Sequence, residues 1–255
     1  MISSRNVAVI ITAYNRPEML RESLELLLAY ERPLAQVIVR DNSPESSHVC
    51  QDLPVTYIWD GRNLGVAGAL NDVLPLVASE LILVLDDDTL LPEDALEKML
   101  AQTSDADVVT IPTPGYRCPP GLFPWSPTVF RRSVFDRYGL PMSELFFTLD
   151  DWEFGHRINK LGGEVRHVAV NLPRHVAGRT WPGRAYFGAR NATFLLSRRI
   201  VWSWPMFAFF ARLVRSAAVS PSAELRGACR RGIWAGLRGR VNEAPEYLPL
   251  QADRP

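Results

Sequence analysis

Apolar runs and amphipathic stretches alternate along the chain from residue 7 to residue 198. The runs that predict buried strands are 7–12, 36–40, 55–59, 81–85, 107–111, 128–130 and 164–170. The stretches that predict helices are 17–30, 66–77, 92–102, 150–161 and 185–198. Alternation of this kind is typical of a doubly wound α/β fold. We therefore expect a single Rossmann-like, mostly parallel sheet flanked by helices.

A helical and basic extension is predicted after residue 199. Arginine is frequent from Arg198 to Arg240, where Glu224 is the only acid. The apolar segment 200–213 is too short to span a bilayer. Two interpretations stay open: the extension binds anionic lipid as a peripheral membrane contact, or its helices pack on the core, close over a site or form a homodimer face.

Three carboxylates stand at the end of the most apolar predicted strand. The run 81–85 passes directly into Asp86, Asp87 and Asp88. Adjacent acids repel one another and are costly to bury without a cation, so a divalent metal is one expectation for this strand end. A solvated acidic turn before the helix at 92–102 is the other. Ligands bind beyond the carboxyl ends of strands in open α/β sheets, which favours the metal.

A second acidic pair, Asp150 and Asp151, begins a predicted helix. The free amides of a helix start stabilise carboxylates, which accounts for at least one of the two acids. The other is a candidate general base for an attacking hydroxyl. His175 follows a predicted strand in a polar loop, where it is either a surface histidine or a metal ligand.

The composition indicates which classes of partner and which cellular compartment fit this chain. Lysine plus arginine and aspartate plus glutamate number 28 each, so the chain as a whole has no nucleic-acid signature. The three cysteines are far apart, without metal-type spacing, and predict free thiols. The first residues do not form a secretory apolar segment. We expect a cytoplasmic protein, with membrane association on the cytoplasmic face left open.

Five motifs in order resemble the GT-A glycosyltransferases of family 2. They are Thr12-Ala13-Tyr14-Asn15-Arg16, Arg40-Asp41-Asn42-Ser43, the segment from Asn63 to Asn71, the Asp86–Asp88 triplet, and Asp150-Asp151-Trp152-Glu153 with Arg157. The resemblance implies a GT-A catalytic domain over residues 1–199, with a nucleotide-sugar half at 1–111 and an acceptor half at 112–199. Residues 200–255 would form the basic helical extension.

The resemblance also implies roles for individual residues. Those expected to bind the nucleotide sugar are Thr12, Ala13, Tyr14, Asn15, Asp41, Asn63, Gly65, Asp86 and Asp87. Asp88 and His175 would hold Mn²⁺ or Mg²⁺, and Asp151 would be the catalytic base. Residues expected to shape the acceptor or donor-sugar subsite are Asp150, Trp152, Trp181 and Arg190.

The expected reaction is inverting transfer of a sugar from a nucleoside diphosphate to an acceptor hydroxyl. The chain is most similar to the galactofuranosyl- and rhamnosyltransferase branch, which implies a UDP- or dTDP-sugar donor. The matching residues are the acidic pair with Phe146 and Phe147, and later His175, Tyr186, Arg190 and Asn191. Leu149 departs from that branch, which often has an aromatic residue before the pair. The acceptor is a glycan, a lipid-linked molecule or a small molecule, in polysaccharide or natural-product glycoside synthesis. Two alternatives remain, a nucleotidyltransferase and a non-catalytic subunit that binds nucleotide sugars. A nucleotidyltransferase usually has a glycine-rich phosphate loop with more than the one cation, Arg16, found after the first strand.

Overall fold

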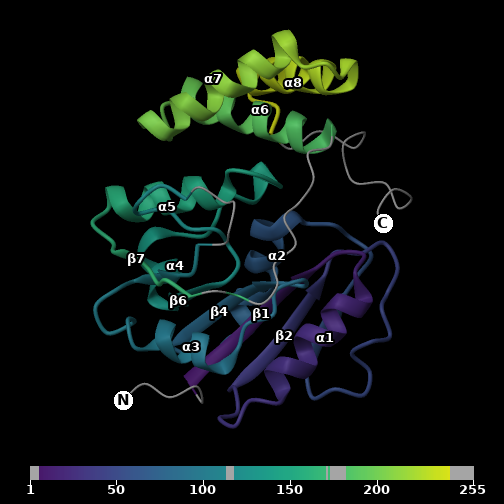
Figure 1. The fold of residues 1–255 in the computed structure, drawn as a ribbon, viewed down its shortest axis with the longest axis vertical. Helices are drawn as coiled ribbons and strands as arrows, with labels where there is room; N and C mark the ends of the chain where they lie inside the picture. Colours follow the sequence, from purple (N-terminus) through teal and green to yellow (C-terminus); the bar gives the residue numbers. More distant parts are fainter. Residues whose placement is uncertain (1–5, 113–117, 171, 173–181, 242–255) are drawn as a thin grey trace.

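The computed structural model describes residues 6–112, 118–170, 172 and 182–241, and its centre is a mixed sheet (Figure 1). The strands are β1 (Val7–Ala13), β2 (Gln36–Asp41), β3 (Thr56–Trp59), β4 (Leu81–Asp86), β5 (Val108–Thr110), β6 (Thr128–Arg131) and β7 (Val165–His167). Their order across the sheet is β3-β2-β1-β4-β6-β5-β7, and only β6 runs antiparallel to its neighbours. The predicted α/β architecture is confirmed.

Helices cover both faces of this sheet, and they are α1 (Pro17–Leu28), α2 (Gly65–Val73), α3 (Glu93–Leu100), α4 (Ser133–Tyr138) and α5 (Asp150–Lys160). The helices that follow are α6 (Pro182–Ser197), α7 (Trp204–Val219) and α8 (Ala223–Leu237). Successive side chains of a strand point to opposite faces. In β1, Val9 therefore packs with α1 and α3, whereas Ile10 packs with α2, α4 and α5. Burial on both faces explains why these strands are uninterrupted apolar runs.

Two local differences from the sequence prediction have simple causes. Helix α4 was not predicted, because its six residues are too few to show a helical period. Helix α2 ends at Val73 and continues only as the 3-10 turn Leu74–Leu76, because Pro75 has no amide hydrogen to donate to an α-helical bond.

The last three helices form a separate layer at one end of the long axis of the molecule, beyond α5 (Figure 1). Helix α8 packs closely on α6 through two glycines. A Cβ on Gly232 would lie 2.4 Å from the carbonyl oxygen of Tyr186, and one on Gly236 would lie 2.3 Å from that of Arg190. In the described part of the chain, no helix has both the length and the apolar content to cross a membrane.

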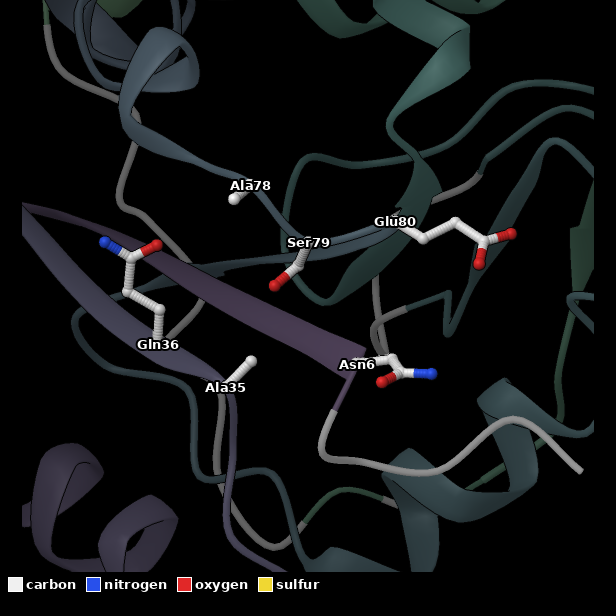
Figure 2. A pocket seen from close by; sticks show the side chains of 6 residues that line it. All are labelled: Asn6, Ala35, Gln36, Ala78, Ser79 and Glu80. Carbon is white, nitrogen blue, oxygen red and sulfur yellow. The ribbon is translucent and has the colours of Figure 1, made fainter.

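The amino ends of β1, β2 and β4 border an open depression on the sheet edge opposite the acidic triplet (Figure 2). Its lining is Asn6, Ala35, Gln36, Ala78, Ser79 and Glu80. Glu80 is the one charged group there among the described residues, so this edge offers little for binding a phosphorylated ligand.

Candidate functional site

The register of the central strands brings three loops to one edge of the sheet. Thr12 lies beside Asp86 on one neighbouring strand and beside Arg40 on the other, and Ala13 lies beside Asp41. Because β1, β2 and β4 are parallel, their carboxyl ends and the loops that follow meet there. The motifs of the first half of the chain thus lie close together, as open α/β sheets arrange ligand sites.

The loop after β1 is fastened to the acidic triplet. The amide of Tyr14 donates to Oδ2 of Asp87 at 2.8 Å, and Arg16 donates to Oδ1 of Asp87 at 3.2 Å and to the carboxylate of Asp88. Asn15 has a left-handed backbone (φ 52°), and its amide donates to Oγ of Ser43 at 2.8 Å. Asp87 therefore holds the loop after β1, since both of its carboxylate oxygens accept hydrogen bonds from that loop.

The electrostatics of the triplet favour a bound cation. Burial, and then the charges of Asp88 and Asp87, raise the pKa of Asp86 to about 8. Burial also raises the pKa of Asp87 to about 7, against the opposing effects of the Tyr14 amide and Arg16. A carboxylate whose neighbours make ionisation costly is stabilised in its charged form by a nearby cation.

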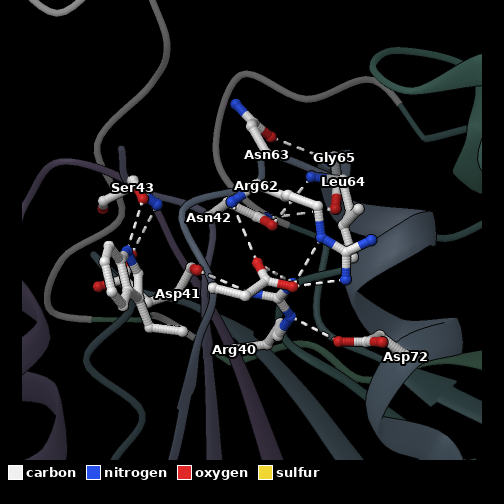
Figure 3. A network of polar contacts seen from close by, with 11 residues as sticks. Arg40, Asp41, Asn42, Ser43, Arg62, Asn63, Leu64, Gly65 and Asp72 are labelled. Atoms are coloured by element: carbon white, nitrogen blue, oxygen red, sulfur yellow. Dashed lines mark hydrogen bonds and ion pairs between the residues drawn. The ribbon is translucent and has the colours of Figure 1, made fainter. Parts of the chain in front are cut away.

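The second strand ends in a buried ionic network (Figure 3). The Arg40 side chain is fully buried, and its guanidinium reaches Asp60 at 2.9 Å and Asp72 at 2.7 Å. Arg62 binds the same Asp60 from the solvent side. The network connects the end of β2 to the loop after β3 and to α2, which fixes the position of the neighbouring Asp41.

Asp41 and Asn42 position the loop that leads into α2. Asp41 is buried and accepts hydrogen bonds from the Ser43 amide at 2.8 Å and the Tyr57 hydroxyl at 2.7 Å. Asn42 accepts from the Leu64 amide at 3.1 Å and donates to the carbonyl of Gly65 at 3.3 Å (Figure 3). The side chain of Asn63 accepts from the Gly65 amide at 3.0 Å.

Residue 65 must be a glycine because the backbone of another segment lies against its Cα. Its φ is +68°, and a Cβ there would lie 2.0 Å from the carbonyl oxygen of Phe146. The start of α2 thus touches the loop before α5, so the two halves of the chain meet at this glycine.

The first acid of the second acidic pair, Asp150, lies near the triplet. Asp150 is buried and accepts a hydrogen bond from Nε1 of Trp125 at 2.9 Å. Burial raises its pKa to about 6, although the Trp125 bond opposes the shift. Asp150 lies near enough to Asp86 for its charge to add to the raised pKa of Asp86. Asp151 is half-buried and accepts from the Trp152 amide at 2.8 Å.

Helix α6 clamps the loop that carries this pair. Phe146, Thr148 and Leu149 all have positive φ, which costs about 1 to 3 kcal/mol at each such residue. Nδ2 of the fully buried Asn191 lies 2.9, 3.0 and 2.7 Å from the carbonyls of Leu145, Phe147 and Thr148.

The neighbouring Arg190 reinforces this clamp. Its side chain donates to the Leu145 carbonyl at 2.8 Å and, through Nε, to Oδ1 of Asn191 at 2.9 Å. Burial lowers the pKa of Arg190 to about 10. Sequence reasoning included Asn191 in the family resemblance, beside Arg190 on the predicted helix, but gave it no role.

The residues expected to shape the sugar or acceptor subsite lie in different surroundings. Trp152 is buried in the apolar contact between α5 and α7, with its ring 5.8 Å from that of Phe209. Arg190 belongs to the clamp. His175 and Trp181 lie outside the described residues.

The donor atoms at the triplet fit a hard divalent cation. Carboxylate oxygens are the ligands that Mg²⁺ and Mn²⁺ prefer. Burial raises the pKa of Asp86 and of Asp87, and a cation would oppose that shift. Arg16 supplies such charge to Asp87 and Asp88. Among the described residues, no group of three or more acid, histidine or cysteine side chains is arranged around one metal position.

Comparison with known proteins gives the class and then the family. Solved structures with this fold are GT-A glycosyltransferases. The family model for glycosyl transferase family 2 matches residues 8–220, and the chain belongs to this family. No curated protein matches the chain significantly.

The similar structures are distant in sequence. A mannosyltransferase from Pyrobaculum calidifontis, in complex with GDP-Man and Mn²⁺, superposes with a TM-score of 0.61 at 17% identity, over 97% of this chain and 79% of that one. A fragment of S. aureus TarS in complex with UDP-GlcNAc superposes with a TM-score of 0.58 at 14% identity, over 92% of this chain and 82% of that one.

Proposed function

We propose that this family 2 glycosyltransferase transfers a sugar, with inversion and with the help of a divalent metal, from a nucleoside diphosphate to an acceptor hydroxyl. The observation that carries the proposal is the approach of two acidic groups from different parts of the chain. The Asp86–Asp88 triplet ends β4, and the Asp150–Asp151 pair begins α5 close enough for Asp150 to influence Asp86.

The first half of the chain would bind the donor. Thr12 and Ala13 end β1, and Tyr14 and Asn15 begin the loop that follows it. Asp41 ends the neighbouring strand β2, and Asn63 and Gly65 lie at the start of α2, where the base and ribose would bind. Asp88 would hold Mn²⁺ or Mg²⁺, with His175 as a further ligand, and Asp86 would face the ribose or the sugar. When bound, the cation would supply positive charge against the diphosphate leaving group.

Asp151 would be the catalytic base. It is half-buried at the start of α5, whereas Asp150 is fully enclosed beside Trp125. The more accessible carboxylate is better placed to accept the proton of an incoming hydroxyl. General base catalysis of this kind contributes about 10² to 10⁴ in rate.

The base is tested by Asp151→Asn. We expect this variant to bind the donor with unchanged affinity while turnover falls at least about 10²-fold. Asp136→Asn, which removes an exposed acid on α4, is the matched control. Near-normal turnover in Asp151→Asn would exclude Asp151 as the base.

The donor and the metal can be found by one thermal-shift screen. UDP-, dTDP- and GDP-sugars are each added with and without Mn²⁺, because the similar structures hold GDP-Man and UDP-GlcNAc. A ligand present at about a hundredfold over its Kd stabilises the protein by about 2.7 kcal/mol. The Asp88→Ala variant should lose the Mn²⁺-dependent part of the shift. An unchanged shift in that variant would remove Asp88 from the metal site.

A further inference from the structure

The outer faces of α7 and α8 form an exposed surface that the proposed reaction does not use. We call this surface the α7–α8 face. On α7, the exposed residues recur at helical spacing, and they are Trp204, Ala208, Ala211, Arg212, Val214, Arg215, Ala218 and Val219. On α8 and at its C-cap they are Ala223, Glu224, Arg230, Arg231, Trp234, Leu237 and Arg238. The opposite side of α7 packs inward through Met206, Phe209 and Leu213. The helices therefore have one face committed to the protein and one directed to solvent.

Large apolar side chains are concentrated on and next to this face. Of the ten large hydrophobic residues that are exposed in the described chain, six lie between residues 202 and 237. They are Trp202, Trp204, Val214, Val219, Trp234 and Leu237. Trp204 is 81% exposed and Trp234 is 60% exposed. A concentration of exposed apolar side chains in one segment is typical of a surface that binds a partner.

The same segment carries a strong positive charge. Residues 198–241 contain nine arginines and no lysine, and Glu224 is the only acid, so their formal net charge is +8 in a chain whose total is zero. Eight of the nine arginines are exposed. The surface is thus basic and apolar at once, whereas acids predominate in the rest of the chain.

Arginine and tryptophan are paired on this surface. The guanidinium of Arg238 lies 5.3 Å from the ring centre of Trp234, and that of Arg199 lies 5.8 Å from the ring centre of Trp202. Tryptophan combines an apolar body with a polar N–H group, and arginine binds phosphate bidentately. This combination suits the headgroup region of a bilayer, where acyl chains, phosphates and water meet.

We propose that the α7–α8 face docks on an anionic lipid bilayer and holds the enzyme at the membrane surface. A bilayer accounts for both halves of the surface, because anionic headgroups pair with the arginines while the interface accepts the tryptophans and aliphatic side chains. A nucleic acid would leave Val214, Val219 and Leu237 without a partner. A second copy of the face would bring two equally positive surfaces together.

The docking is tested with the full-length protein and sedimented vesicles. The protein should pellet with vesicles of phosphatidylcholine mixed with phosphatidylglycerol, and it should stay in the supernatant with phosphatidylcholine alone. Binding should weaken as salt is raised, because the attraction is screened beyond about 8 Å at physiological ionic strength. Tryptophan emission should shift to the blue on binding, since the exposed indoles leave water.

Two sets of variants separate the charge from the apolar contribution. Arg215→Glu with Arg238→Glu should weaken binding at least about 25-fold, since each arginine near an anionic surface contributes about fivefold. Arg32→Glu with Lys98→Glu makes the same change in net charge at exposed positions near α1 and on α3, and it should bind normally. Trp204→Ala with Trp234→Ala should weaken binding severalfold and reduce the emission shift, whereas Leu161→Ala, at an exposed position after α5, should do neither.

Absence of pelleting with anionic vesicles at low salt would overturn the proposal. So would equal loss of binding in the two charge-reversal variants, because the attraction would then be a property of net charge alone. If the arginine and tryptophan variants instead abolished a dimer detected by analytical ultracentrifugation, without vesicle binding by the parent protein, the face would be a contact between copies of this chain.

Discussion

Asn191→Ala is the sharpest test of how the fold holds its second acidic pair. The amide of Asn191 has two hydrogens but three carbonyls within 3.0 Å, so at most two of them receive a full hydrogen bond. Loss of a donor from a buried carbonyl costs about 1 to 3 kcal/mol. Part of this cost is offset, because the positive-φ residues Phe146, Thr148 and Leu149 are then free to relax. We expect the free energy of unfolding to fall by about 2 to 4 kcal/mol.

The same relaxation should move Asp151 and lower the rate more than the affinity. A displacement of about 1 Å in a catalytic group costs on the order of 10²-fold in rate. We therefore expect kcat to fall about 10²-fold and KM for the donor to change less, because the relaxed loop reaches the donor side only through the contact of Phe146 with Gly65. Release of the nucleoside diphosphate measures both constants, and urea unfolding measures stability.

The matched control is Asn159→Ala, which removes another side-chain bond to a backbone carbonyl, from an exposed asparagine near the end of α5 to Gly121. That variant should keep kcat and lose little stability. If Asn191→Ala lost the expected stability and kept the kcat of Asn159→Ala, the clamp would support the fold without positioning the acid.

Three further predictions follow from buried groups near the site. Arg40→Met leaves Asp60 and Asp72 without their buried partner, and it should lower the free energy of unfolding by about 3 kcal/mol in urea titration. Arg62→Ala, on the exposed side of Asp60, should cost less than about 1 kcal/mol. Equal losses in the two variants would refute the role of burial. In Gly65→Ala the new methyl group clashes with the Phe146 carbonyl, so this variant should be far more destabilising than Gly162→Ala. Gly162 has a similar φ of +81°, and a Cβ there has nothing within 4 Å. Similar thermal midpoints of the two variants would show that the backbone at Phe146 moves away from residue 65 at little cost. Asp150 has a folded pKa of about 6, above its ordinary value, so its ionisation removes stability as the pH rises from about 4 to about 6, by about 1.4 kcal/mol for each pH unit. Asp150→Asn cannot ionise, so it should gain stability relative to the parent protein over that range, and parallel pH profiles would contradict the raised pKa.

The central strands and their shared edge could be predicted because they obey simple rules. Strands β1, β2 and β4 are buried on both faces, so each is a continuous apolar run that ends in polar residues. Parallel pairing then brings their carboxyl ends together whatever the exact loop structure. The acidic triplet could be located for the same reason.

The direction of each acid in the triplet could not be predicted. Adjacent residues at a strand end differ only in local backbone angles, and nothing in the sequence indicates that Asp87 turns toward the Tyr14 amide. Arg40 is a comparable case. Arginine is rarely fully buried, and its partners Asp60 and Asp72 are 20 and 32 positions away along the chain.

The interpretation of α6 shows a different limit. Arg190 was expected near a sugar because of its motif, whereas the structure directs it at the backbone before α5. A sequence motif records that a polar residue is needed at a position. It does not distinguish a contact with the substrate from a contact with the loop that carries Asp150 and Asp151.

The close packing of α8 on α6 bears on how this protein can be dissected. Gly232 and Gly236 lie against the backbone of α6 at Tyr186 and Arg190, so α8 forms the outer wall of the helix that clamps the loop. A chain shortened at residue 199 lacks α8 and would expose the covered face of α6 to water. We expect such a fragment to lose transfer activity although the loss of α8 acts on the acidic pair only through α6. Limited proteolysis between α7 and α8 should inactivate the enzyme for the same reason.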